Sequence, residues 1–125
     1  MTHSDINQNN ILTGLNKIRR SKNLKELVQD NALNEIAVSK VKTLCKAQIL
    51  SHNVGSKNWK SWFPKNNKSY GENLARYYDN TDHLIQAWVK SPSHYQIIVE
   101  SDFMMIGIGI VDCDKQNYIV TNFSN

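Results

Sequence analysis

Two histidines and one glutamate stand in settings where their side chains could do chemistry together. His52 lies in a Ser-His-Asn stretch, Glu72 follows Tyr-Gly, and His94 follows Ser-Pro-Ser. Imidazole nitrogens are common ligands of zinc and other borderline divalent metals. A carboxylate can be a third ligand, or it can orient one ring through its second nitrogen. If the fold brings the three together, they form a polar cleft in which His52 and His94 could bind a divalent cation.

The same residues allow a catalytic alternative. A His-Glu-His group could activate water, and Ser51, Ser91 and Ser93 lie close in sequence to the histidines. A serine directly before a proline is typical of a helix N-cap, however, and nucleophilic sites are defined by geometry rather than by sequence neighbours. We therefore expect a binding site without catalytic residues, and keep a metal-assisted hydrolase or peptidase as the alternative.

A long segment between the first histidine and the glutamate is rich in aromatic and basic residues. Residues 57–68 contain four lysines and no acid. An exposed patch of this kind suits a lipid, a sterol or an anionic surface, and resembles single-strand nucleic-acid surfaces in composition. In the other interpretation, which we favour, the aromatic side chains fold inward and tether the loop. The candidate ligand-loop residues are Trp59, Trp62, Phe63 and Tyr70.

The elements that must position these residues follow from apolar periodicity. A helical period predicts one helix over about residues 6–20 and a second from Asp30 or Asn31 to about residue 49. The second helix has a buried stripe and a lysine-bearing outer face. We assign Leu33, Ile36, Ala37, Val41 and Leu44 to the stripe, and Lys40, Lys42 and Lys46 to the outer face.

The second half of the chain changes from helical to strand periodicity. Residues 72–78 are consistent with either a short helix or a strand. Thr81 is predicted to cap a third helix, and Ser91-Pro92 to begin a fourth, short one. Residues 106–111 and 118–123 alternate with a period of two and predict an antiparallel hairpin. Gly107 and Gly109 share one face, so another element must pack close to the backbone there. Helices followed by a hairpin indicate an α+β fold.

Length and composition limit the remaining possibilities. The chain has 125 residues, which predicts a single domain over 1–125 with a polar lead-in at 1–10. No apolar stretch approaches the roughly 18–20 residues of a membrane-spanning helix. The net charge of +4 can be attributed to the 57–68 segment alone, which argues against a nucleic-acid partner. We expect a monomer.

The two cysteines and the two remaining histidines have no motif around them. Cys45 and Cys113 could form one disulfide in an oxidising compartment, or remain two separate buried thiols, which is the interpretation we favour. His3 and His83 are expected to face solvent.

Six short pieces of the sequence resemble, in order, the CAP superfamily of cysteine-rich secretory, antigen 5 and pathogenesis-related-1 proteins. The resemblance covers roughly residues 12–123 and takes the short-loop form of bacterial members. The pieces are Leu15-Asn16-x-x-Arg19, Leu24-x-x-Leu27 with Leu33-x-x-x-Ala37, Ser51-His52-Asn53, Tyr70-Gly71-Glu72-Asn73-Leu74-Ala75, Ala87-Trp88-x-x-Ser91-Pro92-x-His94, and Ile106-Gly107-Ile108-Gly109 with Tyr118-x-x-x-Asn122-Phe123.

This resemblance implies a three-layer α-β-α sandwich with a small antiparallel sheet and a central cleft holding His52, Glu72 and His94. Many eukaryotic members of the family carry a glutamate as the fourth residue of the cleft, a few residues after the tryptophan, where this chain has Val89-Lys90-Ser91. The resemblance further implies a non-enzymatic, secreted or surface-displayed protein and a weakly bound divalent cation such as zinc. Its partner would be a host or cell-surface molecule, or a lipid or sterol bound near the 57–70 loop.

Overall fold

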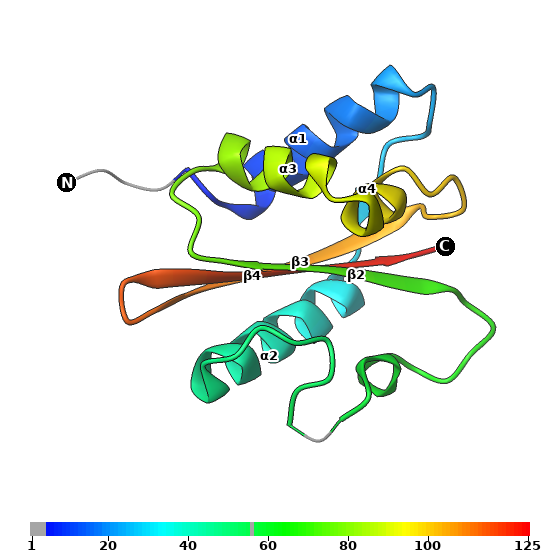
Figure 1. Ribbon diagram of the computed structural model, residues 1–125. Helices are drawn as coiled ribbons and strands as arrows, with labels where there is room; N and C mark the ends of the chain where they lie inside the picture. Colours follow the sequence, from blue (N-terminus) through cyan, green and yellow to red (C-terminus); the bar gives the residue numbers. More distant parts are fainter. Residues whose placement is uncertain (1–4, 56) are drawn as a thin grey trace.

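The computed structural model describes residues 5–55 and 57–125 and shows three layers (Figure 1). Three helices, α1 (Gln8–Ser21), α3 (Thr81–Lys90) and α4 (Pro92–Ile98), cover one face of a central sheet. The longer helix α2 (Asn31–Ala47) covers the other face, together with the loop that carries the 3-10 turn η1 (Trp59–Trp62). The predicted α-β-α sandwich is therefore confirmed.

Within the described residues, the sheet contains four strands in the order β1-β3-β4-β2. The predicted hairpin consists of β3 (Met105–Cys113) and β4 (Gln116–Ser124), and β2 (Tyr70–Arg76) pairs antiparallel with β4 along its whole length. Residues 70–76 thus form a strand, which resolves the alternative left open by the sequence. The short β1 (Val28–Gln29) pairs parallel with β3, so the sheet is mixed; two residues are too few to show a period.

Side-chain caps begin three of the helices. The Asn7 carboxamide caps α1 and the Asp30 carboxylate caps α2, as expected for residues with short polar side chains. Asn80 caps α3, so the prediction of Thr81 in that role was wrong by one residue. The Thr81 N–H and hydroxyl donate instead to the side chain and the carbonyl of Asp5, which tie the start of the chain to α3.

Two apolar clusters fill the spaces on either side of the sheet. The first joins α1, α3 and α4 to the sheet through residues such as Leu15, Leu84 and Ile106, and the second joins α2 to it through Val41 and Leu74. A Cβ atom added to Gly107 would lie 2.1 Å from the backbone of Leu33, and one added to Gly109 would lie 2.3 Å from the Ala37 carbonyl oxygen. Helix α2 therefore packs directly on β3, and this explains the two glycines.

A disulfide joins Cys45 at the end of α2 to Cys113 at the end of β3, with an S–S length of 2.06 Å and a Cα–Cα distance of 5.8 Å. The interpretation of two separate thiols was wrong. Their separation of 68 residues hides the pairing from local sequence patterns, because it depends on how α2 lies against the hairpin. In the described part of the chain, no helix is long and apolar enough to cross a membrane.

Candidate functional site

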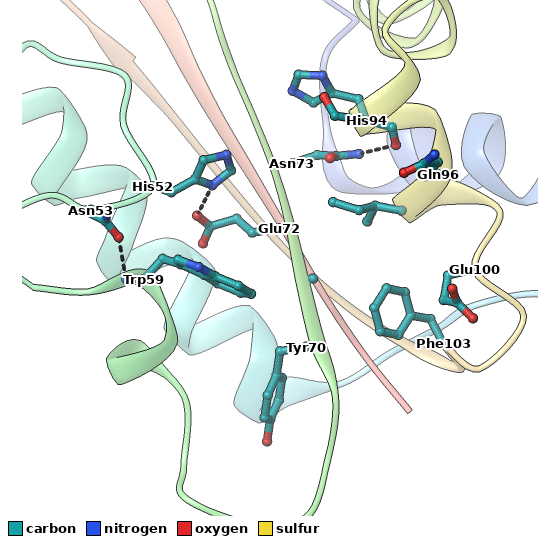
Figure 2. Close-up of a pocket in the computed structure, with 13 residues that line it drawn as sticks. His52, Asn53, Trp59, Tyr70, Glu72, Asn73, His94, Gln96, Glu100 and Phe103 are labelled. Atoms are coloured by element: carbon teal, nitrogen blue, oxygen red, sulfur yellow. Dashed lines mark hydrogen bonds and ion pairs between the residues drawn. The ribbon is translucent and has the colours of Figure 1, made fainter.

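His52, Glu72 and His94 line one pocket of about 640 Å³ beside β2 (Figure 2). His52 comes from the loop after α2, Glu72 from β2 and His94 from α4. Figure 2 shows the two histidines on opposite sides of the strand, with the glutamate between them on the His52 side. Side chains from three separate elements thus converge on one concave surface.

Successive side chains of β2 point to opposite faces of the sheet, so this strand contributes residues to the site on both faces. Glu72 points toward α2, and the next residue, Asn73, points toward the opposite helices, where its Nδ2 donates to the His94 carbonyl at 3.2 Å. Both residues are buried, at 3% and 0% exposure. Two successive strand residues therefore connect the His52 side of the cleft to the His94 side.

A buried lysine holds the glutamate and the first histidine together. The Lys40 ammonium donates to Glu72 Oε1 at 2.6 Å and to the His52 carbonyl at 2.5 Å. The same carboxylate oxygen lies 2.9 Å from His52 Nδ1. Since a carboxylate only accepts, the Nδ1 atom carries a proton, and in the neutral form of the ring the lone pair lies on His52 Nε2.

The assignment of Lys40 to the solvent side of its helix was wrong. Its side chain is 0% exposed, and burial lowers the pKa of the Lys40 ammonium, while the hydrogen bond and the charge of Glu72 oppose that change. The spacing contained a signal: Lys40 follows Ala37 by three residues and precedes Leu44 by four, which places it on the buried stripe. We had assigned Lys40 to the outer face because it is charged, whereas its position in the helical period predicts the buried face.

The second histidine is held differently. Ser91 Oγ lies 2.7 Å from His94 Nδ1, and the imidazole stacks on the indole of Trp88 at 6.3 Å between ring centroids. Ser91 occupies the N-cap position of α4, as predicted, but its side chain makes no capping hydrogen bond. Its hydroxyl can donate to His94 Nδ1 or accept from it, so either ring nitrogen of His94 can carry the proton.

Burial, and then the nearby charge of His52, lower the pKa of the His94 imidazole from its ordinary value of 6.5. The two rings line the same pocket from opposite sides of β2. A depressed pKa keeps His94 neutral at physiological pH, and a neutral imidazole is the form that binds metals.

The cleft offers two imidazole rings as possible nitrogen donors. In residues 5–55 and 57–125, no group of three or more His, Cys, Asp or Glu side chains is placed to hold a metal ion together. Glu72 Oε1 is already shared by Lys40 and His52, so this oxygen orients a ring, while Glu72 Oε2 has no hydrogen-bond partner among the described residues. His52 Nε2 and His94 Nε2 are the two atoms that could hold a cation, with water in the remaining positions.

The aromatic residues of the loop pack against one another and against the cleft. Phe63 is 6% exposed and stacks on Tyr70 with 4.3 Å between ring centroids, and Trp59 meets Phe63 edge to face at 6.0 Å. The ring of Trp62 lies near two ammonium groups, Lys57 at 4.2 Å and Lys40 at 5.7 Å. This arrangement matches a tethered loop. Trp59 and Tyr70 also line the pocket.

A second pocket of about 450 Å³ adjoins the first, because His52 and His94 line both. Its other walls come from the end of β2, from α3 and from the residues that precede His52. They are Leu50, Ser51, Leu74, Ala75, Arg76, Tyr78, Ala87, Trp88 and Ser91. Outside both pockets, His83 is exposed and lies 2.8 Å from Asp79, and His3 is outside the described residues.

Known proteins resemble this chain in sequence pattern and in fold. The profile of the cysteine-rich secretory protein family (CAP) matches residues 12–123. Comparison with the curated proteins gave no match. Among solved structures, an outer surface protein from Borrelia burgdorferi is similar over 100% of this chain and 98% of its own, with a TM-score of 0.87 and 20% identity.

Two further structures are similar in fold at low identity. An extracellular SCP-domain protein from Bacillus anthracis has a TM-score of 0.80 and 21% identity, over 92% of this chain and 39% of its own. NaASP2, described with Zn²⁺, has a TM-score of 0.66 and 14% identity, over 92% of this chain and 77% of its own. This chain spans well under half of the Bacillus protein.

Proposed function

Because this chain belongs to the cysteine-rich secretory protein (CAP) family, we propose that it is a non-enzymatic binding protein of the cell exterior, with a cleft that also takes a divalent cation. The observation that carries the proposal is the state of the two histidines. The Nδ1 atom of each ring is engaged, by Glu72 for His52 and by Ser91 for His94, which leaves each Nε2 for a ligand.

The cation would be held by His52 Nε2 and His94 Nε2, and zinc suits imidazole nitrogen. Glu72 and Lys40 would act behind His52 by fixing its tautomer and orientation. Two protein ligands leave several positions to water, so binding would be weak and reversible. The NaASP2 structure described with Zn²⁺ is consistent with zinc in this fold.

An exterior location is supported by two observations. The Cys45–Cys113 disulfide is typical of oxidising compartments, since cytosolic thiols are kept reduced. Structurally similar proteins are described as an outer surface protein and an extracellular protein. A partner in that setting would be a host or cell-surface molecule. Phe63 is buried and Trp62 packs against the core cluster on the α2 side, which does not favour a lipid or sterol as the ligand of the loop.

Hydrolysis is the second candidate, favoured by the 2.7 Å contact between Ser91 and His94. In the described part of the chain, no carboxylate bonds to the His94 ring to complete a Ser-His-acid arrangement. A metal-assisted hydrolase would give turnover on a peptide and ester panel that a chelator abolishes and that His94→Ala removes without unfolding. A Ser91–His94 mechanism would instead keep its turnover with the chelator and lose it in Ser91→Ala. Absence of turnover with zinc present would exclude both.

Zinc titration followed by NMR of the histidine side chains tests the binding proposal. We expect the His52 and His94 signals to move together, and those of the exposed His83 to serve as the internal control. His52→Ala and His94→Ala should each weaken zinc binding, and His83→Ala should not. If zinc shifts His52 and His94 no more than His83, the shared cation site is wrong.

A further inference from the structure

Strand β2 is an edge strand whose free edge faces the cleft. It pairs with β4 on one side and has no other neighbour in the order β1-β3-β4-β2 of the described strands. Its residues 70–73 line the first pocket and 74–76 line the second, so the two pockets follow the strand from end to end. Figure 2 shows the strand between the His52 wall and the His94 wall. The cleft is therefore a groove with a strand edge along its floor.

The register of β2 shows which main-chain groups point into the groove. Tyr77 N–H donates to the Asn117 carbonyl at 2.8 Å, in line with the register that pairs Arg76 with Tyr118. Bonded and non-bonded pairs alternate in an antiparallel ladder, so the odd-numbered residues bond to β4. The main-chain groups of the even-numbered residues therefore face the free edge; these are Tyr70, Glu72, Leu74 and Arg76.

Other elements satisfy only part of this edge. Trp88 Nε1–H donates to the Leu74 carbonyl at 3.1 Å, which confirms the direction of that group. Among the described residues, no hydrogen bond outside the ladder reaches the main chain of Glu72. Exposed strand edges are commonly blocked by proline, by lysine or by a bulge, and β2 contains none of these. An unpaired edge inside a groove can accept another strand, and since Glu72 is 3% and Leu74 is 6% exposed, the walls of the groove must separate for a strand to reach it.

The walls of the groove provide apolar surface for alternate side chains of such a strand. At the Tyr70 end, the first pocket is bounded by Phe103 and Ile97 on one side and by Trp59 on the other. At the opposite end, Leu50 and Tyr78 line the second pocket. Alternate residues of a bound strand point to opposite sides, so each wall would receive every second side chain.

The two ends of the groove carry opposite charges. Glu100 lines the first pocket and forms no ion pair within the described residues. Arg76 lines the second pocket, and its guanidinium donates to two neutral acceptors, the Gln48 carbonyl and the Tyr118 hydroxyl. A ligand with a basic group at the Glu100 end and an acidic group at the Arg76 end would complement both.

We propose that the ligand of this cleft is an extended peptide that adds to β2 as a fifth strand. The seven residues of β2 span about 20 Å, which matches a peptide of about five to seven residues. Its basic end lies at Glu100 and its acidic end at Arg76. This proposal deepens the proposed function, because it names the class of ligand for the same cleft.

The probe is a seven-residue peptide of alternating valine and threonine with lysine first and glutamate last. Amide hydrogen exchange followed by NMR should show new protection at Tyr70, Glu72 and Arg76 and none at Gly71 and Asn73, whose main chain already bonds to β4. A copy of the peptide that is N-methylated on its pairing edge should not bind. Protection without this alternation, or equal binding of the methylated peptide, would overturn the proposal.

Charge reversal tests the orientation. Arg76→Glu should weaken binding of the lysine-first peptide about tenfold, and should favour a peptide with glutamate first and lysine last. Lys17→Glu, an equal charge change on the exposed face of α1, is the matched control, and thermal unfolding checks that each variant is folded. Equal losses in the two variants would refute the charge complementarity.

The same samples separate this proposal from the cation site. Peptide binding is measured once with a chelator and once with zinc, while zinc is titrated separately against the His52 and His94 signals. If the peptide does not bind while zinc still shifts both histidine signals, the peptide proposal is wrong and the cation site is retained. If zinc shifts neither histidine signal while the alternating amide protection persists, the cation site is wrong and the peptide proposal is retained.

Discussion

Among the described residues, each face of the sheet buries one cationic side chain, and the two side chains have different partners. On the α1 side, Arg19 is 0% exposed and donates to four backbone carbonyls, including those of Ile98 and Phe103 at 2.8 and 2.9 Å. On the α2 side, Lys40 is equally buried but donates to one carbonyl and to the Glu72 carboxylate. Arg19 thus binds only groups that do not titrate, whereas Lys40 is joined to ionisable groups of the cleft.

The unsatisfied polar atoms lie on both faces of the sheet. The buried side-chain atoms without a hydrogen-bond partner in the described residues include Glu72 Oε2 and Trp62 Nε1 on the α2 side and Asn73 Oδ1 on the other side, and none belongs to Arg19. Buried polar groups are normally satisfied, and exceptions are commonly found where a protein has a function. The comparison teaches that Arg19 secures the fold, while Lys40 stabilises a region that is arranged for binding.

Replacing Arg19 should have the largest effect. Arg19→Ala leaves several buried carbonyls without a donor, and at about 1–3 kcal/mol for each it should lower the free energy of unfolding by about 5 kcal/mol. Arg20→Ala is the matched control, because that neighbour forms an exposed ion pair with Glu26, and its loss should cost less than about 1 kcal/mol. Urea denaturation measures both, and similar losses would contradict the assigned role of Arg19.

Removing the disulfide should have the second-largest effect on the free energy of unfolding. The bond closes a loop of 68 residues between α2 and β3, so the Cys45→Ala/Cys113→Ala variant should lose about 4 kcal/mol through the added freedom of the unfolded chain. Because the bond lies on the α2 face, hydrogen exchange should rise in α2 before it rises in α1. A uniform rise in both helices would argue against this difference between the two faces.

Breaking the Lys40 pair should have a slightly smaller effect. Lys40→Met strands the Glu72 carboxylate in the interior and should cost about 3 kcal/mol of unfolding free energy. The double variant Lys40→Met/Glu72→Leu should recover part of the loss, because an apolar pair replaces an unpaired charge. A double variant with the summed loss of the two single ones would show that the pair is not coupled.

The Lys40→Met variant also tests whether Lys40 positions the residues of the cleft or only stabilises the fold. If Lys40 positions Glu72 and the His52 loop, Lys40→Met should weaken zinc binding at His52 in the folded protein, whereas a conservative Lys40→Arg change should retain more of it. Zinc affinity unchanged in folded Lys40→Met would leave the lysine with a stabilising role alone.

The smallest expected effect is that of His94 on the pH dependence of stability. The pKa of His94 is lowered in the folded protein, so below its ordinary value of 6.5 the unfolded chain binds more protons than the folded one. The contribution of His94 to stability is therefore complete above pH 6.5 and is lost as the pH falls toward its folded pKa. His94→Gln should flatten this part of the stability profile, as measured by thermal unfolding across about pH 4–8. An unchanged slope would contradict the depressed pKa.

Much of the architecture could be predicted from local patterns. Helical periods located α1 and α2, and alternation located the β3–β4 hairpin. Asp30 or Asn31 was expected to cap α2, and Asp30 is the cap. These signals are readable because each acts between residues a few positions apart. The order of six motif pieces also indicated the family. The cation and its ligands, in contrast, stay a prediction.

The contacts that define the cleft depend on residues far apart in the chain. Lys40 and Glu72 are 32 residues apart, and Cys45 and Cys113 are 68 apart. Whether a lysine on a helical stripe is buried depends on whether a carboxylate lies opposite it, and that is decided when α2 packs on the sheet. The free edge of β2 likewise exists only because β2 joins the sheet last in the strand order, beside β4. Residue types and local periods therefore determine the elements and the candidate side chains, while long-range packing sets the partners of each side chain and the groove between them.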